Sequence, residues 1–139
     1  TLPHLAGPTE ITAFLGSVRQ VLAPGGHLLL QILNYGRILD RDIRQLPPLV
    51  TPQLEFRRSY APRLAGQATT GLLFRTELHI RETGTTSTAV TELYPIRPEN
   101  LIRLLEDAGF RNIRTSGSWT GANFEMAESF MLVVDAEKP

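Results

Sequence analysis

Two short and almost entirely apolar runs constrain the fold of this 139-residue chain more than any other feature. The first run is His27–Leu33, and the second covers 130–134 within the segment 129–136. The first run is too short for an independent helix, and its pattern is typical of a strand covered on both faces, as in a parallel sheet. Both runs are therefore predicted to be buried strands of an α/β sheet.

Helices are predicted between the strands. Apolar residues recur at helical spacing over 8–22, Pro8 suits a first helical position, and the Pro-Gly-Gly turn at 24–26 ends the helix. A second helix opens at Pro98 and ends at Gly109, where a positive φ costs little, and a strand over 110–117 follows it. A short helix is also expected over 37–46, closed by Pro47-Pro48.

The middle of the chain has a different pattern. The segments 54–63, 71–82 and 85–93 alternate with a period of about two and are rich in Thr, Phe, Tyr and Val. They predict three antiparallel strands inserted at 54–93, with turns near Gly66 and at Thr83-Gly84. The connection over 118–127 is short enough for a hairpin, so the last strand is expected to be antiparallel to its predecessor.

Composition excludes several classes of function. Fourteen basic residues balance 14 acidic residues, which removes the electrostatic basis for binding nucleic acid. The sequence contains no run of about 18 apolar residues, so no membrane span is expected. Without cysteine there is no disulfide or thiolate metal site, and no metal site is expected at His79, which lacks a second histidine nearby. These features fit a single cytoplasmic domain.

Two motifs resemble a known enzyme family. Residues 14–33, with Val21-Leu22-Ala23-Pro24-Gly25-Gly26, resemble the segment leading into the fifth strand of class I S-adenosylmethionine-dependent methyltransferases. Residues 101–113, with the run Leu-Leu-Glu-Asp-Ala-Gly-Phe at 104–110, resemble that family's last helix and sixth strand, and the final apolar strand is similar to its seventh. The resemblance implies an α/β fold: the C-terminal half of a Rossmann-like methyltransferase sheet, with strands 5, 7 and 6, flanking helices and the inserted three-stranded antiparallel region.

Two loops are similar to those of glycine N-methyltransferase-like members. Thr1-Leu2-Pro3-His4-Leu5 is similar to the loop after their fourth strand, and Asn34-Tyr35-Gly36-Arg37 to their Asn-Tyr-Asp segment. Gly36 replaces the Asp, so the identity of the substrate is not carried over. The resemblance implies that cofactor contacts come from Thr1, Leu2 and His4 and substrate contacts from Asn34, Tyr35 and Arg37; no catalytic residue is identified.

Each of these residues has a simpler structural interpretation. His4 is either a base or orienting group or a plain loop histidine, and Asn34 either bonds a substrate or satisfies its own turn. Tyr35 is a pocket wall or a core-edge aromatic, and Arg37 clamps a carboxylate or lies at the surface. Trp119 and Phe124 are expected to pack onto the core, and the alternative is that they line an interface. Six residues of the inserted strands either cover a substrate or form a solvated face: Arg57, Arg58, Tyr60, Arg75, His79 and Arg81.

The family's cofactor-holding elements are missing from the sequence. It contains no glycine-rich GxGxxG loop and no acidic residue after a first strand, so residues 1–139 are expected to form a partial domain without the N-terminal cofactor-binding half. The expected parent is an enzyme that methylates a small molecule with S-adenosylmethionine, while this chain alone is inactive, with weak or no cofactor binding. The free edge of strand 27–33 predicts either self-association, as in a dimer, or a piece cut from a longer folded protein. The alternative is a non-catalytic binding or oligomerisation module on the same scaffold.

Overall fold

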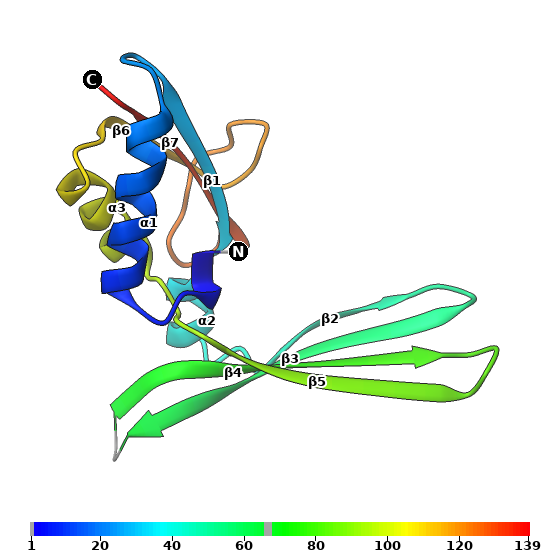
Figure 1. The fold of residues 1–139 in the computed structure, drawn as a ribbon. Coiled ribbons are helices and arrows are strands. Elements are labelled where there is room, and N and C mark those ends of the chain that lie inside the picture. Colours follow the sequence, from blue (N-terminus) through cyan, green and yellow to red (C-terminus); the bar gives the residue numbers. More distant parts are fainter. Residues whose placement is uncertain (1, 66–67) are drawn as a thin grey trace. The chain divides into compact units, whose positions relative to one another are not determined.

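A computed structural model describes residues 2–65 and 68–139, and the chain divides into two units (Figure 1). Unit 1 comprises Thr1–Arg41 and Ile96–Pro139, and unit 2 is Asp42–Pro95. Unit 2 therefore contains the predicted insertion at 54–93 and also the preceding residues 42–53. Of the helices in the described residues, none has both the length and the apolar character needed to cross a membrane.

Unit 1 is built on a sheet with the strand order β1-β7-β6, in which each neighbouring pair is antiparallel. This order confirms the predicted arrangement of strands 5, 7 and 6, including the antiparallel last strand. The elements of unit 1 are η1 (Leu2–His4), α1 (Pro8–Val21), β1 (His27–Leu33), α2 (Tyr35–Asp40), α3 (Pro98–Asp107), β6 (Arg111–Ser116) and β7 (Met131–Glu137).

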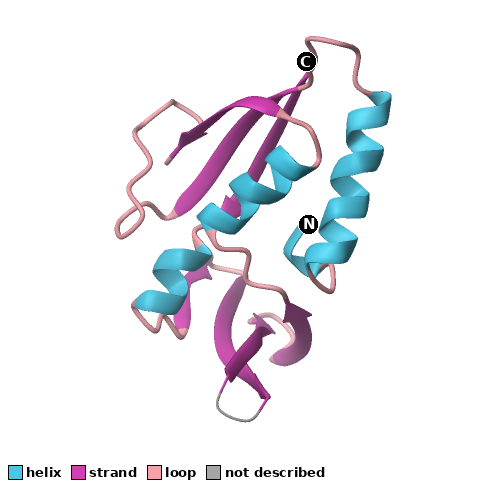
Figure 2. Ribbon diagram, turned by 90° about the vertical axis from the view of Figure 1, so that its left-hand side faces the viewer, coloured by secondary structure: helices cyan, strands magenta, loops and turns pink. Residues whose placement is uncertain are grey.

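The core of unit 1 lies between this sheet and the helices α1 and α3, which contact each other (Figure 2). Strand residues alternate between two faces, so Leu30 and its partner Val134 lie on the same face of the sheet. Fully buried side chains from both helices, the sheet and the α3–β6 connection complete the core, and each contributes about 2 kcal/mol through the apolar area that it removes from water: Ile11, Leu15, Leu101, Leu105, Phe110, Leu132 and Val134.

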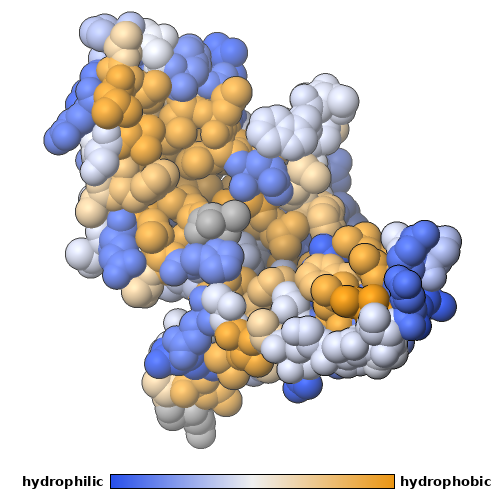
Figure 3. All heavy atoms as spheres, turned by 45° about the vertical axis from the view of Figure 1, so that its right-hand side comes forward, coloured by the Kyte–Doolittle hydropathy of each residue, from blue (hydrophilic) through white to orange (hydrophobic). Residues whose placement is uncertain are grey.

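The expectation that the run His27–Leu33 is covered on both faces is wrong for this structure. His27, Leu29 and Gln31 are exposed, with Leu29 at 60%, whereas Ile32 on the alternate face is buried. The reason is that, among the described residues, α1 and α3 lie on one face of the sheet (Figure 2), and β1 is an edge strand paired with β7. Figure 3 shows apolar residues gathered on the side of unit 1 that faces the viewer.

The turn after α1 is tied to the last residues of the chain. Gly25 donates its backbone N–H to the carbonyl of Lys138 at 2.7 Å, and Lys138 donates its own N–H to Gly26 at 2.8 Å. The Lys138 Nζ donates to the carbonyl of Leu22 at 2.6 Å. A cation therefore satisfies a carbonyl just past the end of α1, where the helix dipole favours positive charge.

Unit 2 is an antiparallel sheet of four strands in the order β2-β3-β4-β5 among the described residues, rather than the three predicted. The strands are β2 (Gln45–Val50), β3 (Leu54–Ala65), β4 (Ala68–Ile80) and β5 (Thr85–Leu93). The helix expected over 37–46 ends at Asp40, and Pro47 and Pro48 lie inside edge strand β2 at a register shift. Proline lacks a backbone N–H, but an edge strand with an irregular register does not need every donor.

Candidate functional site

Asn34 is the centre of the candidate site at the carboxyl end of β1. Its side chain is fully buried, and its Nδ2 donates to the carbonyls of Met126 at 2.8 Å and Ser129 at 2.9 Å. Its Oδ1 accepts the backbone N–H of Arg37 at 3.2 Å, which caps α2. One amide therefore joins the start of α2 to the connection between β6 and β7.

Further contacts hold the same two segments together. The backbone N–H of Asn34 donates to the carbonyl of Phe130 at 3.1 Å, and Arg41 forms an ion pair with Glu128. At Gly36 an added Cβ would lie 2.9 Å from Met126 Sδ and 3.2 Å from Asn34 Oδ1. The packing around this position thus leaves little room for the Asp that the resembled family has there.

Tyr35 and Arg37, which follow Asn34, differ in burial and in hydrogen bonding. Tyr35 is 3% exposed, so its ring belongs to the packed interior of unit 1. Arg37 is half-buried, and its Nε is buried without a hydrogen-bond partner in the part of the chain that the structure describes. A buried donor without an acceptor is costly, so the guanidinium of Arg37 is suited to a ligand that brings an oxygen.

The residues of the N-terminal loop differ in how deeply they are buried. Leu2 and Pro3 lie in η1 and are buried, whereas His4 is exposed. Thr1, which was also predicted to contact cofactor, lies outside the described residues. The roles of Leu2 and His4 in cofactor binding, like those of Asn34, Tyr35 and Arg37 in substrate binding, stay predictions.

Sequence reasoning missed an ion pair between α2 and the start of α3. The Arg97 Nη2 donates to Asp40 Oδ1 at 2.6 Å and its Nη1 to Asp40 Oδ2 at 3.3 Å. The hydrogen bond from Arg97 holds the pKa of the Asp40 carboxyl below its ordinary value, against the opposing effect of desolvation. The two residues are 57 positions apart, so no local pattern indicated the pair.

The aromatic residues of the β6–β7 connection do not all pack as expected. Trp119 is 63% exposed, which contradicts its predicted packing onto the core, whereas Phe124 is half-buried. The connection is held instead by backbone carbonyls bonded to Asn34, and these bonds do not require the indole.

In unit 2, Tyr60 stacks on Phe74 with 5.3 Å between ring centroids, and burial raises the pKa of the Tyr60 phenol.

Comparisons with known proteins identify the fold. No family model and no curated protein sequence matches this chain. Among solved structures, the CcbJ methyltransferase from Streptomyces caelestis aligns with a TM-score of 0.77 at 18% identity, over 99% of this chain and 53% of its own. A S-adenosylmethionine-dependent methyltransferase from Clostridium acetobutylicum has a TM-score of 0.77 at 11% identity, over 99% and 54%. CalS10, an amino pentose methyltransferase from Micromonospora echinaspora, has a TM-score of 0.56 at 18% identity, over 98% and 54%.

The chain therefore has the fold of part of a S-adenosylmethionine-dependent methyltransferase, and it spans about half the length of the structures it matches. This finding confirms the partial methyltransferase fold that the sequence motifs predicted. At these identities the likeness concerns the fold.

Proposed function

We propose that this chain is the substrate-side part of a cytoplasmic S-adenosylmethionine-dependent methyltransferase that acts on a small molecule. The observation that carries the proposal is the methyltransferase fold over 99% of the chain, matched to 53% of the CcbJ structure. A small-molecule acceptor is supported by CalS10, an amino pentose methyltransferase described with bound S-adenosylmethionine. In such an enzyme the protein contributes chiefly by positioning the acceptor for in-line attack.

The residues after β1 are proposed to hold the acceptor. The unpartnered Nε of Arg37 offers a hydrogen bond to an acceptor oxygen, and Asn34 fixes the backbone from which Arg37 projects. Tyr35 would supply an apolar wall beside them. Under this proposal Asn34 is a positioning residue, because its amide already bonds three backbone groups.

The N-terminal loop does not by itself fit S-adenosylmethionine. Leu2 and Pro3 are buried and carry no polar side chain, which leaves His4 as the one polar side chain of η1. The cofactor's ribose hydroxyls and charged groups require further polar partners. This supports the proposal that Thr1, Leu2 and His4 only border the cofactor, and that the chain alone binds it weakly or not at all and is inactive.

Isothermal titration of the 139-residue chain with S-adenosylmethionine tests this part of the proposal. We expect no saturable heat up to about 100 μM ligand, whereas a low-micromolar Kd would overturn this expectation.

The coding region upstream of Thr1 tests the proposal that the parent protein is an enzyme. The enzyme proposal is supported if this region encodes an in-frame segment with a glycine-rich loop, and if that segment joined to this chain transfers a methyl group. A start codon directly upstream favours the alternative, a binding or oligomerisation module without chemistry.

Self-association through β1 is the second part of the proposal. β1 is an edge strand, and its Leu29 side chain is 60% exposed, which favours pairing with another copy. Sedimentation velocity over a wide concentration range is expected to show a dimer that Leu29→Lys disrupts. Val21→Lys is the matched control, because Val21 is also exposed but lies on α1. A monomer at every concentration would contradict the proposal.

A further inference from the structure

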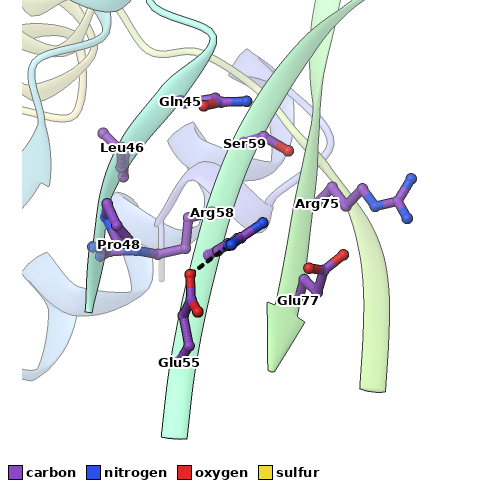
Figure 4. Close-up of a pocket in the computed structure, with 9 residues that line it drawn as sticks. Gln45, Leu46, Pro48, Glu55, Arg58, Ser59, Arg75 and Glu77 are labelled. Atoms are coloured by element: carbon purple, nitrogen blue, oxygen red, sulfur yellow. Dashed lines mark hydrogen bonds and ion pairs between the residues drawn. The ribbon is translucent and has the colours of Figure 1, made fainter. Parts of the chain in front are cut away.

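Unit 2 contains a cavity of about 380 Å³ on the face of its sheet (Figure 4). This volume is within the range of pockets that hold small molecules. Its polar lining comes from three neighbouring strands, and all of it belongs to unit 2. The lining residues with side chains suited to hydrogen bonding include Gln45, Glu55, Arg57, Ser59, Arg75 and Glu77.

The strand register explains why these charges share one face. Arg57 is paired with Glu77, and Ser59 with Arg75, across β3 and β4. Alternate residues of a strand point to the same face, so Arg75 and Glu77 both face the cavity side, with Cα atoms about 7 Å apart along β4. In Figure 4 both side chains project from the strand next to the one that carries Glu55.

One pair of charges in the pocket is already satisfied. The Arg57 Nε donates to Glu55 Oε1 at 2.6 Å, and this bond lowers the pKa of Glu55 and raises the pKa of Arg57. The side chains of Arg75 and Glu77, in contrast, form no hydrogen bond or ion pair with any residue that the structure describes, although Glu77 lies across the ladder from Arg57. The cavity therefore offers the Arg75 guanidinium and the Glu77 carboxylate to a ligand, and Arg58 keeps a buried Nε without a partner among the described residues.

Arg58 fixes the wall beside β2. Its Nη2 donates to the carbonyl of Pro47 at 3.0 Å, and its guanidinium carbon lies 5.8 Å from the centroid of the Phe56 ring. Leu46 and Pro48 complete this side of the cavity. These contacts position Arg58 on the β2 side of the cavity.

We propose that this pocket binds a small amino carboxylate. The ligand's carboxylate accepts hydrogen bonds from the Arg75 guanidinium and the Ser59 hydroxyl, and its ammonium group donates to the Glu77 carboxylate. A phosphate dianion fits less well, because it would face the Glu77 carboxylate while Arg57 is already bonded to Glu55 and Arg58 to the carbonyl of Pro47. A plain carboxylate leaves Glu77 without a partner. The ligand can occupy this site whether or not unit 1 takes part in methyl transfer.

Nuclear magnetic resonance of the ¹⁵N-labelled full chain tests the proposal with three matched probes: 4-aminobutyrate, butyrate and butylamine. We expect 4-aminobutyrate at up to about 20 mM to shift the backbone amides around Arg57, Arg75 and Glu77 in a saturable way. Butyrate and butylamine, which each lack one charged group, are expected to bind at least about tenfold more weakly.

Variants inside and outside the pocket test whether binding depends on the pocket residues. Arg75→Gln and Glu77→Gln are each expected to weaken 4-aminobutyrate binding about tenfold, because each removes one charged contact. Arg63→Gln is the control, since Arg63 lies on β3 outside the pocket and pairs with Glu92. Absence of saturable shifts would overturn the proposal, as would equal binding of butyrate or an Arg63→Gln effect as large as that of Arg75→Gln.

Discussion

Replacing Asn34 by alanine is expected to destabilise unit 1 by about 3 kcal/mol. The side chain is fully buried and forms three hydrogen bonds, two to carbonyls of the β6–β7 connection and one to the N–H of Arg37. Each bond to a carbonyl contributes about 1 kcal/mol, and loss of the α2 cap costs about 1 kcal/mol more. The carbonyls of Met126 and Ser129 would lose these donors.

Asn34→Asp separates the cap from the two carbonyl bonds. Aspartate keeps an oxygen that accepts the Arg37 N–H, and its charge suits a helix N-terminus. It also places a carboxylate against the carbonyl oxygens of Met126 and Ser129 in a buried site, where an unpaired charge is costly. Asn34→Asp is therefore expected to be at least as unstable as Asn34→Ala.

Urea unfolding followed by circular dichroism measures both changes, and the fluorescence of Trp119 reports on the connection itself. Asn123→Ala is the control, because Asn123 is exposed in the same connection and its variant is expected to lie within about 0.5 kcal/mol of the native chain. A native-like stability for Asn34→Asp would show that Asn34 acts only as a cap. That result would refute the idea that its amide anchors the connection.

Three further predictions concern unit 1. Gly109→Ala is expected to cost about 1–2 kcal/mol, because φ is +89° and the new Cβ would lie 2.9 Å from Arg19 Nε; an unchanged Tm would argue against strain there. Asp40→Asn removes the partner of Arg97 and is expected to cost about 0.5 kcal/mol near neutral pH. Because folding lowers the pKa of Asp40, the stability difference between the native chain and Asp40→Asn is present above the carboxyl's ordinary pKa and disappears as pH falls through the lowered value. Urea unfolding from neutral to acid pH measures this difference, and a difference that does not change with pH would contradict the prediction. Leu105→Ala, at a fully buried position, is expected to cost about 3 kcal/mol in the same assay, and a loss below about 1 kcal/mol would place Leu105 outside the core.

The sheet of unit 1 could be predicted because its signals are local. The apolar runs, Pro8, Pro98 and Gly109 each mark a strand or a helix end, and the structure places the elements where these residues predict. The second face of β1 could not be assessed in this way, because an apolar run does not reveal what covers it. The strand at 45–50 was missed, since two prolines indicate an edge strand only when the neighbouring strand is known.

The candidate site was predictable only in part, for a similar reason. The sequence indicated the loop at Asn34, but the carbonyls that bind its amide belong to residues 92 and 95 positions away. The arginines of unit 2 were singled out as a group, while the cavity depends on the register that sets Arg57 against Glu77. A register shift between Arg63 and Leu64 contributes to that alignment, and no residue pattern predicted it.

The bond from Lys138 to the carbonyl of Leu22 has a chemical consequence. Lys138 is the only lysine in the sequence, so reagents that acylate lysine side chains have a single target. Its amine is held in a hydrogen bond to Leu22, so the rate of acylation is expected to report how often this one contact breaks. One residue thus provides a site-specific chemical probe of the contact between the end of β7 and the turn after α1, without any engineered label.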